Sequence, residues 1–314
     1  MHPEKIKPIV KGLIKHIPGV HEFLHKKTGG SIQSRYCYTV WMRHLANWSL
    51  FKDGIPEVVA ELGPGDSLGT GLAALLSGCK HLYALDVVKY WDTERNIKMF
   101  EELVELFKNK ADLPNSMEYP QVIPSLDNYD FPSHILPDKW LKETLAEDRL
   151  NAIRNELSNI DNPNNTFIKY QIPWNDSNVI STHSVDFLYS QAVLEHVEDL
   201  ETTYSAMQKW IKPAGIISHS IDFRSHGLTK SWNGHWTFNN FEWRIVKGGK
   251  IFLLNRQPLS RHVELTLKNG FKILKKAVVK MENKLKPNRF SNEFKKMSEE
   301  DITSSVAYIL SIKE

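Results

Sequence analysis

A carboxylate and three glycines stand close together after an apolar run. Glu61 is followed by Gly63, Gly65 and Gly69, and an apolar segment that favours a helix comes next. A loop between a strand and a helix presents backbone N–H groups, and glycines let a ligand approach the backbone closely. The dinucleotide-binding fingerprint is not met, because its third glycine would fall at Leu68. A carboxylate at Glu61 would repel a pyrophosphate and attract a cationic or amino group.

A second carboxylate, Asp86, stands near the end of the next apolar run, HLYALDVV. An acidic side chain at the end of the second strand of such a unit accepts hydrogen bonds from the two hydroxyls of an adenosine ribose. Together with Glu61 it indicates a nucleoside that has a positively charged tail and no phosphates. S-adenosylmethionine (SAM), a sulfonium with an α-amino group, is such a ligand.

Histidines gather on and after the apolar run 215–223, where a strand is expected to end. Open α/β sheets bind ligands at the carboxyl ends of their strands. Removing a proton from an acceptor hydroxyl requires a base of near-neutral pKa, which histidine supplies. We expect His226 to be this base, with His235 as the second choice and Asp222 as the group that orients it. No metal site is expected, because hard cations prefer several carboxylates. The alternative is that each histidine has only a packing role.

The elements around these residues follow an α/β rhythm. Apolar runs predict strands at 57–62, 81–88, 166–172, 184–190 and 215–223, and a closing strand pair at 273–280 and 304–312. Such runs suit a parallel sheet that is covered by helices on both faces. We therefore expect a Rossmann-like, doubly wound, mostly parallel α/β sheet over residues 55–314. Residues 1–54 are expected to form an N-terminal helical extension.

Residues 109–165 interrupt the rhythm with several prolines and then the helical stretch 138–157. An α/β unit needs no connection of this length, so we expect a helical insertion that forms a lid or a wall of the substrate site. A structural embellishment without a role at the site is the alternative.

The first thirty residues are basic, with six lysines against two glutamates. Ile6, Ile9, Val10, Leu13 and Ile14 recur at helical spacing and predict a short amphipathic helix. We expect this helix to pack on the domain that follows. A helix that lies on a membrane surface is the alternative.

Three segments together resemble class I SAM-dependent methyltransferases: VVAELGPGDSLGTG, ALDVV and SVDFLYSQAVLEHVEDL. The resemblance extends in order and spacing over residues 55–275. The LEHV segment is similar to the small-molecule branch that includes the ubiquinone and sterol methyltransferases, and NRQPLSRHVELTLKNGFKI resembles a late element of that group. The resemblance implies that Glu61, Gly63 and Gly65 line the methionine part of SAM and that Asp86 binds the ribose.

The resemblance also implies roles for the loops after the third and fourth strands. In the family, the loop after the third strand covers the adenine, usually through an acidic residue. This chain has no acid at 171–174, so Trp174 or a backbone group is expected to take that place. Gln191 follows the fourth strand, where the cofactor meets the acceptor.

The composition agrees with a folded, globular protein. Of the 314 residues, 41% are apolar and 25% are charged, and 40 Lys+Arg against 37 Asp+Glu leave a charge of only +3. This balance does not favour nucleic acid as a partner. Two cysteines, the lack of an apolar run of membrane-spanning length and the absence of a signal sequence predict a cytoplasmic protein. The basic N-terminus leaves peripheral membrane contact open.

We therefore expect a SAM-dependent methyltransferase that acts on a small-molecule or glycan acceptor. The histidines favour oxygen as the methylated atom, and the tryptophans of the loop 231–244 favour a sugar, because tryptophan faces stack on sugar rings. Two alternatives stay open. An NAD(P)-dependent oxidoreductase is disfavoured by Leu68 and Glu61, whereas a non-catalytic SAM-binding module would keep the cleft and lack the base.

Overall fold

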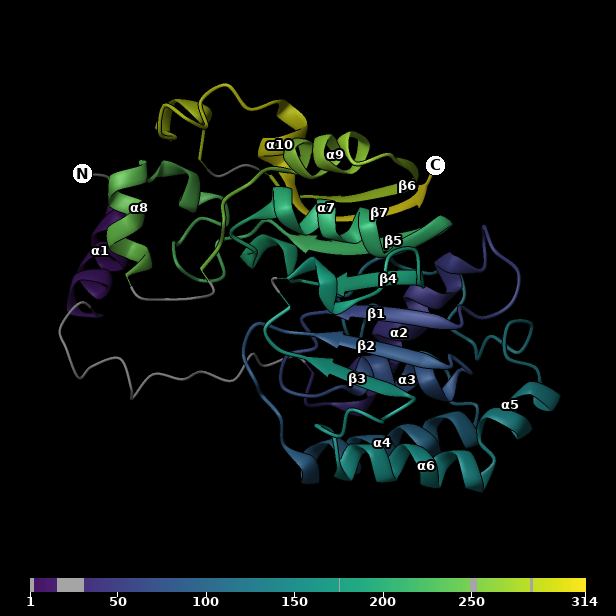
Figure 1. Ribbon diagram of the computed structural model, residues 1–314. Coiled ribbons are helices and arrows are strands. Elements are labelled where there is room, and N and C mark those ends of the chain that lie inside the picture. Colours follow the sequence, from purple (N-terminus) through teal and green to yellow (C-terminus); the bar gives the residue numbers. More distant parts are fainter. Residues whose placement is uncertain (1–2, 16–30, 175, 249–252, 283–284) are drawn as a thin grey trace.

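A computed structural model describes residues 3–15, 31–174, 176–248, 253–282 and 285–314 (Figure 1). A seven-stranded sheet runs through the molecule in the order β3-β2-β1-β4-β5-β7-β6. Its pairs are parallel except for those that β7 makes with β5 and β6. The strands are Val58–Leu62 (β1), His81–Leu85 (β2), Ile168–Gln171 (β3), Val185–Gln191 (β4), Ile211–Asp222 (β5), Phe271–Lys280 (β6) and Ser304–Lys313 (β7). The expected Rossmann-like, mostly parallel sheet and its closing strand pair are confirmed.

The strand order reverses at β1. This strand pairs in parallel with β2 on one side and with β4 on the other. In open α/β sheets, ligands bind beyond the carboxyl ends of the strands at such a switch point. The loops that follow β1, β2 and β4 therefore form the place where a ligand is expected.

Helices cover both faces of the sheet (Figure 1). Alternate strand residues face opposite cores: Val59 and Phe187 belong to one, Ala60 and Leu188 to the other. The first core is covered by α2 (Ser34–Trp48), α3 (Gly69–Leu76), α4 (Thr93–Lys108), α5 (Asp138–Thr144) and α6 (Glu147–Ser158), and the second by α7 (Leu200–Trp210) and α9 (Leu259–Lys268). A short helix, α10 (Glu299–Thr303), precedes β7.

The N-terminal region contributes two helices with different surroundings. Most of α2 is buried in the first core, where Trp41 contacts Phe187 and Tyr189 of β4. The amphipathic helix α1 (Pro3–Lys15) packs on α8 (Asn240–Lys247) beside the sheet domain (Figure 1). The boundary expected at residue 54 stays a prediction.

Two details of the expected helices are wrong. The segment 231–244, expected to be a loop, ends inside α8, which begins with a capping box between Asn239 and Glu242. The stretch 138–157 is two helices, because the chain leaves helical geometry at Leu145 and Ala146 before α6 starts. Glu147 and Asp148 in the first turn of α6 suit the positive end of a helix dipole.

The insertion 109–165 has two parts. Its helix α6 packs on α4, where Arg154 pairs with Glu101 at 2.6 Å, and extends the cover of the sheet. Its earlier residues, 118–121, reach instead toward α2 and the loop after β5. A role as a lid stays a prediction for this earlier part. Among the described helices, none has the length and apolar character needed to span a membrane.

Candidate functional site

The loop after β1 adopts a backbone conformation that favours glycine. Gly63 has φ +65° and Gly65 has φ +73°. A Cβ atom on Gly63 would lie 2.7 Å from the side chain of Val193, in the loop after β4. The Gly63 N–H donates to the carbonyl oxygen of Leu85 at the end of β2, at 2.8 Å. The glycines thus let three loops meet closely at the switch point.

Asp86 follows β2 directly and fixes the glycine loop from the side. Its carboxylate accepts hydrogen bonds from the backbone N–H groups of Val87 at 2.7 Å and Gly65 at 3.3 Å. Burial raises the pKa of Asp86, and these backbone hydrogen bonds lower it in part. A carboxylate has about four lone-pair positions, so Asp86 has capacity left to accept from the hydroxyls of a ligand.

Glu61, on β1, carries a buried carboxyl group two residues before the glycine loop. It is 6% exposed, and its Oε2 makes no hydrogen bond with the described part of the chain. Burial raises the pKa of Glu61 to about 8, and the contribution of the neighbouring Tyr189 hydroxyl only partly opposes this. The group is therefore mostly neutral at pH 7 when no cation is near. A buried acid without a charge partner is costly unless a ligand supplies one.

An unexpected contact joins α2 to the insertion next to these carboxyl groups. Arg35 donates to both carboxylate oxygens of Glu118 at 2.7 Å, and the Tyr36 ring meets the Tyr119 ring edge-on at 5.6 Å. Burial raises the pKa of Tyr36, and the acidic groups of Glu195 and Glu61 raise it further. No pattern in the sequence signals Glu118 or Tyr119, because their place depends on tertiary packing.

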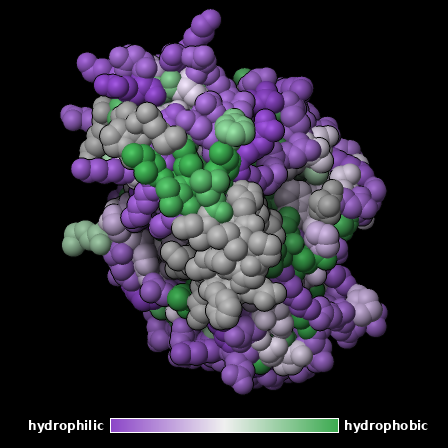
Figure 2. Space-filling model, turned by 90° about the vertical axis from the view of Figure 1, so that its left-hand side faces the viewer, coloured by the Kyte–Doolittle hydropathy of each residue, from purple (hydrophilic) through white to green (hydrophobic). Residues whose placement is uncertain are grey.

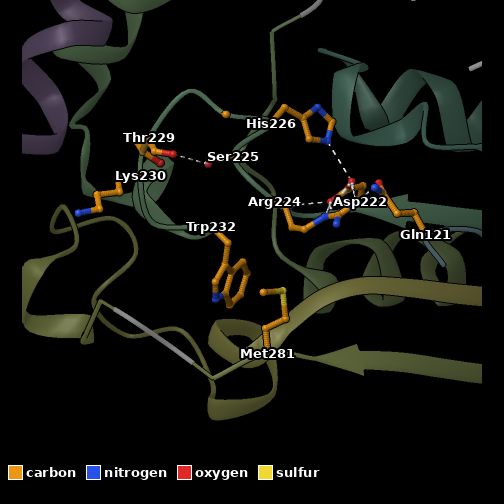
Figure 3. Close-up of a pocket in the computed structure, with 10 residues that line it drawn as sticks. Gln121, Asp222, Arg224, Ser225, His226, Thr229, Lys230, Trp232 and Met281 are labelled. Carbon is orange, nitrogen blue, oxygen red and sulfur yellow. Dashed lines mark hydrogen bonds and ion pairs between the residues drawn. The ribbon is translucent and has the colours of Figure 1, made fainter. Parts of the chain in front are cut away.

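A cavity of about 590 Å³ opens beyond β5 (Figure 3). The residues that give it its chemical character are Gln121, Arg224, His226, Lys230, Trp232 and Met281. Four of them carry polar or cationic groups, and Trp232 and Met281 form an apolar wall. Gln121 comes from the insertion and accepts a hydrogen bond from Arg224 at 3.2 Å. The insertion therefore supplies part of the wall of this pocket.

Asp222 ends β5, and its carboxylate contacts two side chains of this pocket, Arg224 and His226. Arg224 donates to its two carboxylate oxygens, with Nη2 at 2.6 Å from Oδ2 and Nε at 2.8 Å from Oδ1. The His226 Nε2 lies 3.2 Å from the Asp222 Oδ2 (Figure 3). Although burial opposes ionisation, the hydrogen bonds from Arg224 and His226 hold the pKa of Asp222 well below its usual range. Asp222 is therefore a permanent anion that can orient an imidazole.

His226 and His235, the two histidines expected to act as base, have very different surroundings. His226 has φ +48°, lines the pocket, and has a side chain that is 34% exposed. His235 is 2% exposed and packs on Trp236, and burial lowers its pKa to about 3. His226 is thus accessible to an acceptor, whereas His235 is buried and is not among the residues that line the pocket. The catalytic role of either residue stays a prediction.

Glu195 was not singled out as a site residue by sequence reasoning, although it lies in the LEHV segment. It is 3% exposed, neither carboxylate oxygen has a hydrogen-bond partner in the described chain, and burial raises its pKa well above its usual range. Ligand atoms of Glu195, His196 and His226 lie within 4.8 Å of one another. Such a set has the donors for a divalent cation, and it can also share protons. That the protein has no metal site therefore stays a prediction.

Two expected cofactor residues have different settings. Gln191 ends β4 and is half-buried next to the glycine-loop region. Trp174 is buried and packs against Trp210 of α7, with ring centroids 6.0 Å apart. Packing in the second core thus accounts for the Trp174 side chain, and its contact with an adenine stays a prediction.

No family model matches this sequence, and no curated protein is similar to it. Among solved structures, a SAM-dependent methyltransferase from Mesorhizobium loti is 14% identical, with a TM-score of 0.42 over 85% of this chain and 96% of that chain. A SAM-dependent methyltransferase from Methanosarcina mazei is 12% identical, with a TM-score of 0.45 over 85% and 96% of the two chains. Phosphoethanolamine N-methyltransferase 2 from Haemonchus contortus, in complex with SAM, is 12% identical, with a TM-score of 0.41 over 90% and 57%. Similarities this distant do not assign an activity.

Proposed function

We propose that the protein is a SAM-dependent methyltransferase. The observation that carries this proposal is the buried carboxyl group of Glu61, whose Oε2 has no hydrogen-bond partner among the described residues, beside a glycine loop at the switch point of the sheet. A site with this character favours a cationic ligand and disfavours a pyrophosphate. The LEHV segment and the other motifs that resemble class I methyltransferases support the same choice.

The residues present fit SAM in three respects. Glu61 offers a carboxylate to the positively charged methionine end, and Gly63 and Gly65 leave room for close approach to the backbone. Asp86 keeps acceptor capacity for the ribose hydroxyls. When bound, SAM supplies an electrophilic methyl group on sulfur.

The pocket beyond β5 is proposed to hold the methyl acceptor, a small molecule or glycan that is methylated on oxygen. His226 takes the proton of the acceptor hydroxyl, and Asp222 orients the imidazole and stabilises its charged form. Arg224 neutralises Asp222 when the histidine is uncharged. Trp232 offers an apolar wall to the acceptor. Because methyl transfer needs in-line geometry, positioning and exclusion of water provide most of the remaining rate.

The test is calorimetry with SAM, S-adenosylhomocysteine and NADH, followed by turnover of methyl-labelled SAM with a panel of metabolites and glycans. We expect SAM and S-adenosylhomocysteine to bind and NADH not to bind. Binding of NADH alone would support the oxidoreductase alternative. Binding of SAM without transfer to any acceptor would support a non-catalytic SAM-binding module.

A further inference from the structure

The helix α1 leaves a row of apolar side chains in solvent although it is packed on α8. Its inner face carries Ile9 and Gly12, and a Cβ atom on Gly12 would overlap the Ile245 carbonyl group. On the neighbouring face of the same helix, Ile6, Val10 and Leu13 are 52%, 48% and 52% exposed. Residues at these spacings share one face of a helix. Packing on α8 therefore satisfies only part of the apolar surface of α1.

The neighbouring helix α8 adds to this surface. Phe241 is 69% exposed and lies one turn before Ile245, the residue whose backbone touches α1. Figure 2 shows this side of the molecule, where hydrophobic side chains gather in a patch that has hydrophilic ones beside it. We call Ile6, Val10, Leu13 and Phe241 the α1–α8 patch. Contiguous exposed apolar surface of this kind marks an interaction site.

The charges around the patch indicate what it contacts. Lys7 and Lys11 are exposed on the next face of α1, and Arg244 is exposed on α8. The acidic residues of the same helices are occupied: Glu242 pairs with Lys5 at 2.6 Å, and Glu4 accepts from Ser231. Within the part of the chain that the structure describes, these basic side chains form no ion pair, and apolar side chains beside such basic ones are typical of a helix that lies on an anionic lipid surface.

The helix α1 is joined to a loop that lines the acceptor pocket. The carboxylate of Glu4 accepts hydrogen bonds from the Ser231 hydroxyl at 2.6 Å and the Ser231 N–H at 3.1 Å. Ser231 stands between Lys230 and Trp232, which both line the pocket, and α1 lies beside this loop in Figure 3. Contact of α1 with a lipid surface would therefore bring this side of the pocket close to that surface.

We propose that the α1–α8 patch docks the protein on an anionic bilayer and that the pocket takes its methyl acceptor from that bilayer, as an amphiphile whose polar part enters the pocket. The docking stands on the patch alone, whereas the choice of acceptor rests on the proposed methyltransferase function.

Docking is tested by sedimentation with vesicles of phosphatidylcholine, with and without phosphatidylglycerol. We expect the full chain to bind the anionic vesicles and to be released by salt. The pair Val10→Asp and Leu13→Asp, made together, should lower the vesicle partition coefficient at least about tenfold, because two side chains lose apolar burial. The matched control is Leu50→Asp with Leu267→Asp, which alters side chains that are 62% and 55% exposed elsewhere. The control should bind as the unmodified protein does.

Three results would overturn docking. The first is no binding to anionic vesicles, and the second is equal binding of both double variants. The third is a protein that is a dimer without vesicles and becomes a monomer only in the patch variant, which would mean that the patch binds a second copy of the chain. Circular dichroism and thermal unfolding of the same variants show whether they are folded, and SAM calorimetry tests the proposed function independently of lipid.

The lipid acceptor is tested with vesicles of a total cellular lipid extract and methyl-labelled SAM. We expect label in the organic phase, reduced in the patch variant. Label confined to the aqueous phase, or absent from both phases, would overturn the lipid acceptor. If SAM itself fails to bind, the proposed function fails first, whatever the vesicles show.

Discussion

Replacing Glu61 by Gln tests the central electrostatic argument, because the two side chains have the same shape and only Glu61 can ionise. In the free protein, burial raises the pKa of Glu61 to about 8 from the ordinary value of 4.5. At pH 7 only about one molecule in ten carries the carboxylate that would pair with a cationic ligand. Because only the ionised form would bind SAM tightly, the apparent affinity for SAM at pH 7 should be about tenfold lower than the affinity of that form.

The pH dependence of SAM affinity follows from the direction of this shift. Pairing with the cofactor lowers the pKa of Glu61, so binding at pH 7 releases close to one proton per site. The dissociation constant should fall by up to about tenfold per pH unit from pH 6 to 8 and level off above the free pKa. For Glu61→Gln the proton release and this slope should vanish, and affinity at pH 8.5 should drop by about 10- to 100-fold as a charge-assisted contact is lost.

The same shift also makes a prediction about stability. An acid whose folded pKa is raised costs stability above its unfolded pKa, here from pH 4.5 up to about 8. At pH 7 the difference from 4.5 corresponds to a cost on the order of 3 kcal/mol, which Gln does not incur. The free Glu61→Gln protein should thus be more stable than the unmodified protein at pH 7 and lose this advantage near pH 4.

The assay is titration calorimetry in two buffers of different ionisation enthalpy, together with thermal unfolding over the same pH range. Glu57→Gln is the matched control, because Glu57 lies just before β1 and is solvated. A SAM affinity independent of pH in the unmodified protein, or equal slopes for all three proteins, would refute the assignment of Glu61 to the cationic end of the ligand.

Three further predictions concern the loops around this carboxyl group. Asp86→Asn should weaken SAM by about 10- to 100-fold in calorimetry, because charged acceptors for the ribose are lost; an unchanged affinity would remove the ribose assignment. Gly63→Ala should lower the free energy of unfolding by about 1–3 kcal/mol more than Gly54→Ala, because both have positive φ but only Gly63 would also meet Val193; equal denaturant midpoints for both variants would contradict this. His226→Ala should lower turnover by about 10²–10⁴-fold and leave SAM affinity within a few-fold; parallel loss of both would make His226 a structural residue of the cleft.

The strands and the glycine loop could be predicted because local sequence determines them. Buried parallel strands read as short apolar runs, and the Gly63 and Gly65 positions need φ values that other residues rarely adopt. The helix α8 had a local signal that was overlooked: Asn239 and Glu242 stand at capping-box spacing ahead of Trp243 and Val246. The tryptophans of 231–244 predict a sugar-binding loop, whereas Trp243 of α8 packs in the cluster that contains Ile9 of α1.

The insertion was harder to predict because its placement depends on contacts between distant segments. Glu118 reaches Arg35 across 83 residues of sequence, and Gln121 reaches Arg224 across 103. Neither residue has a spacing or a neighbour that suggests such a contact. Glu195 differs again: its segment was noticed for its resemblance, but only the structure shows that its carboxyl group is buried and lies near His226.

The two buried glutamates together explain how a free site can be stable and still select a cation. Burial keeps Glu61 largely neutral and raises the pKa of Glu195 well above its usual range, so the empty cleft avoids much of the cost of isolated buried charges. A cationic ligand reverses this balance, because its charge makes ionisation of a neighbouring acid favourable. A ligand that bears a pyrophosphate gains nothing from the same groups and meets Asp86 as an additional negative charge. The proposed selection of SAM over a dinucleotide therefore arises from the negative charge that Glu61 acquires when a cation binds, and the released proton reports that ionisation, so proton release is the measurement that separates these ligands most directly.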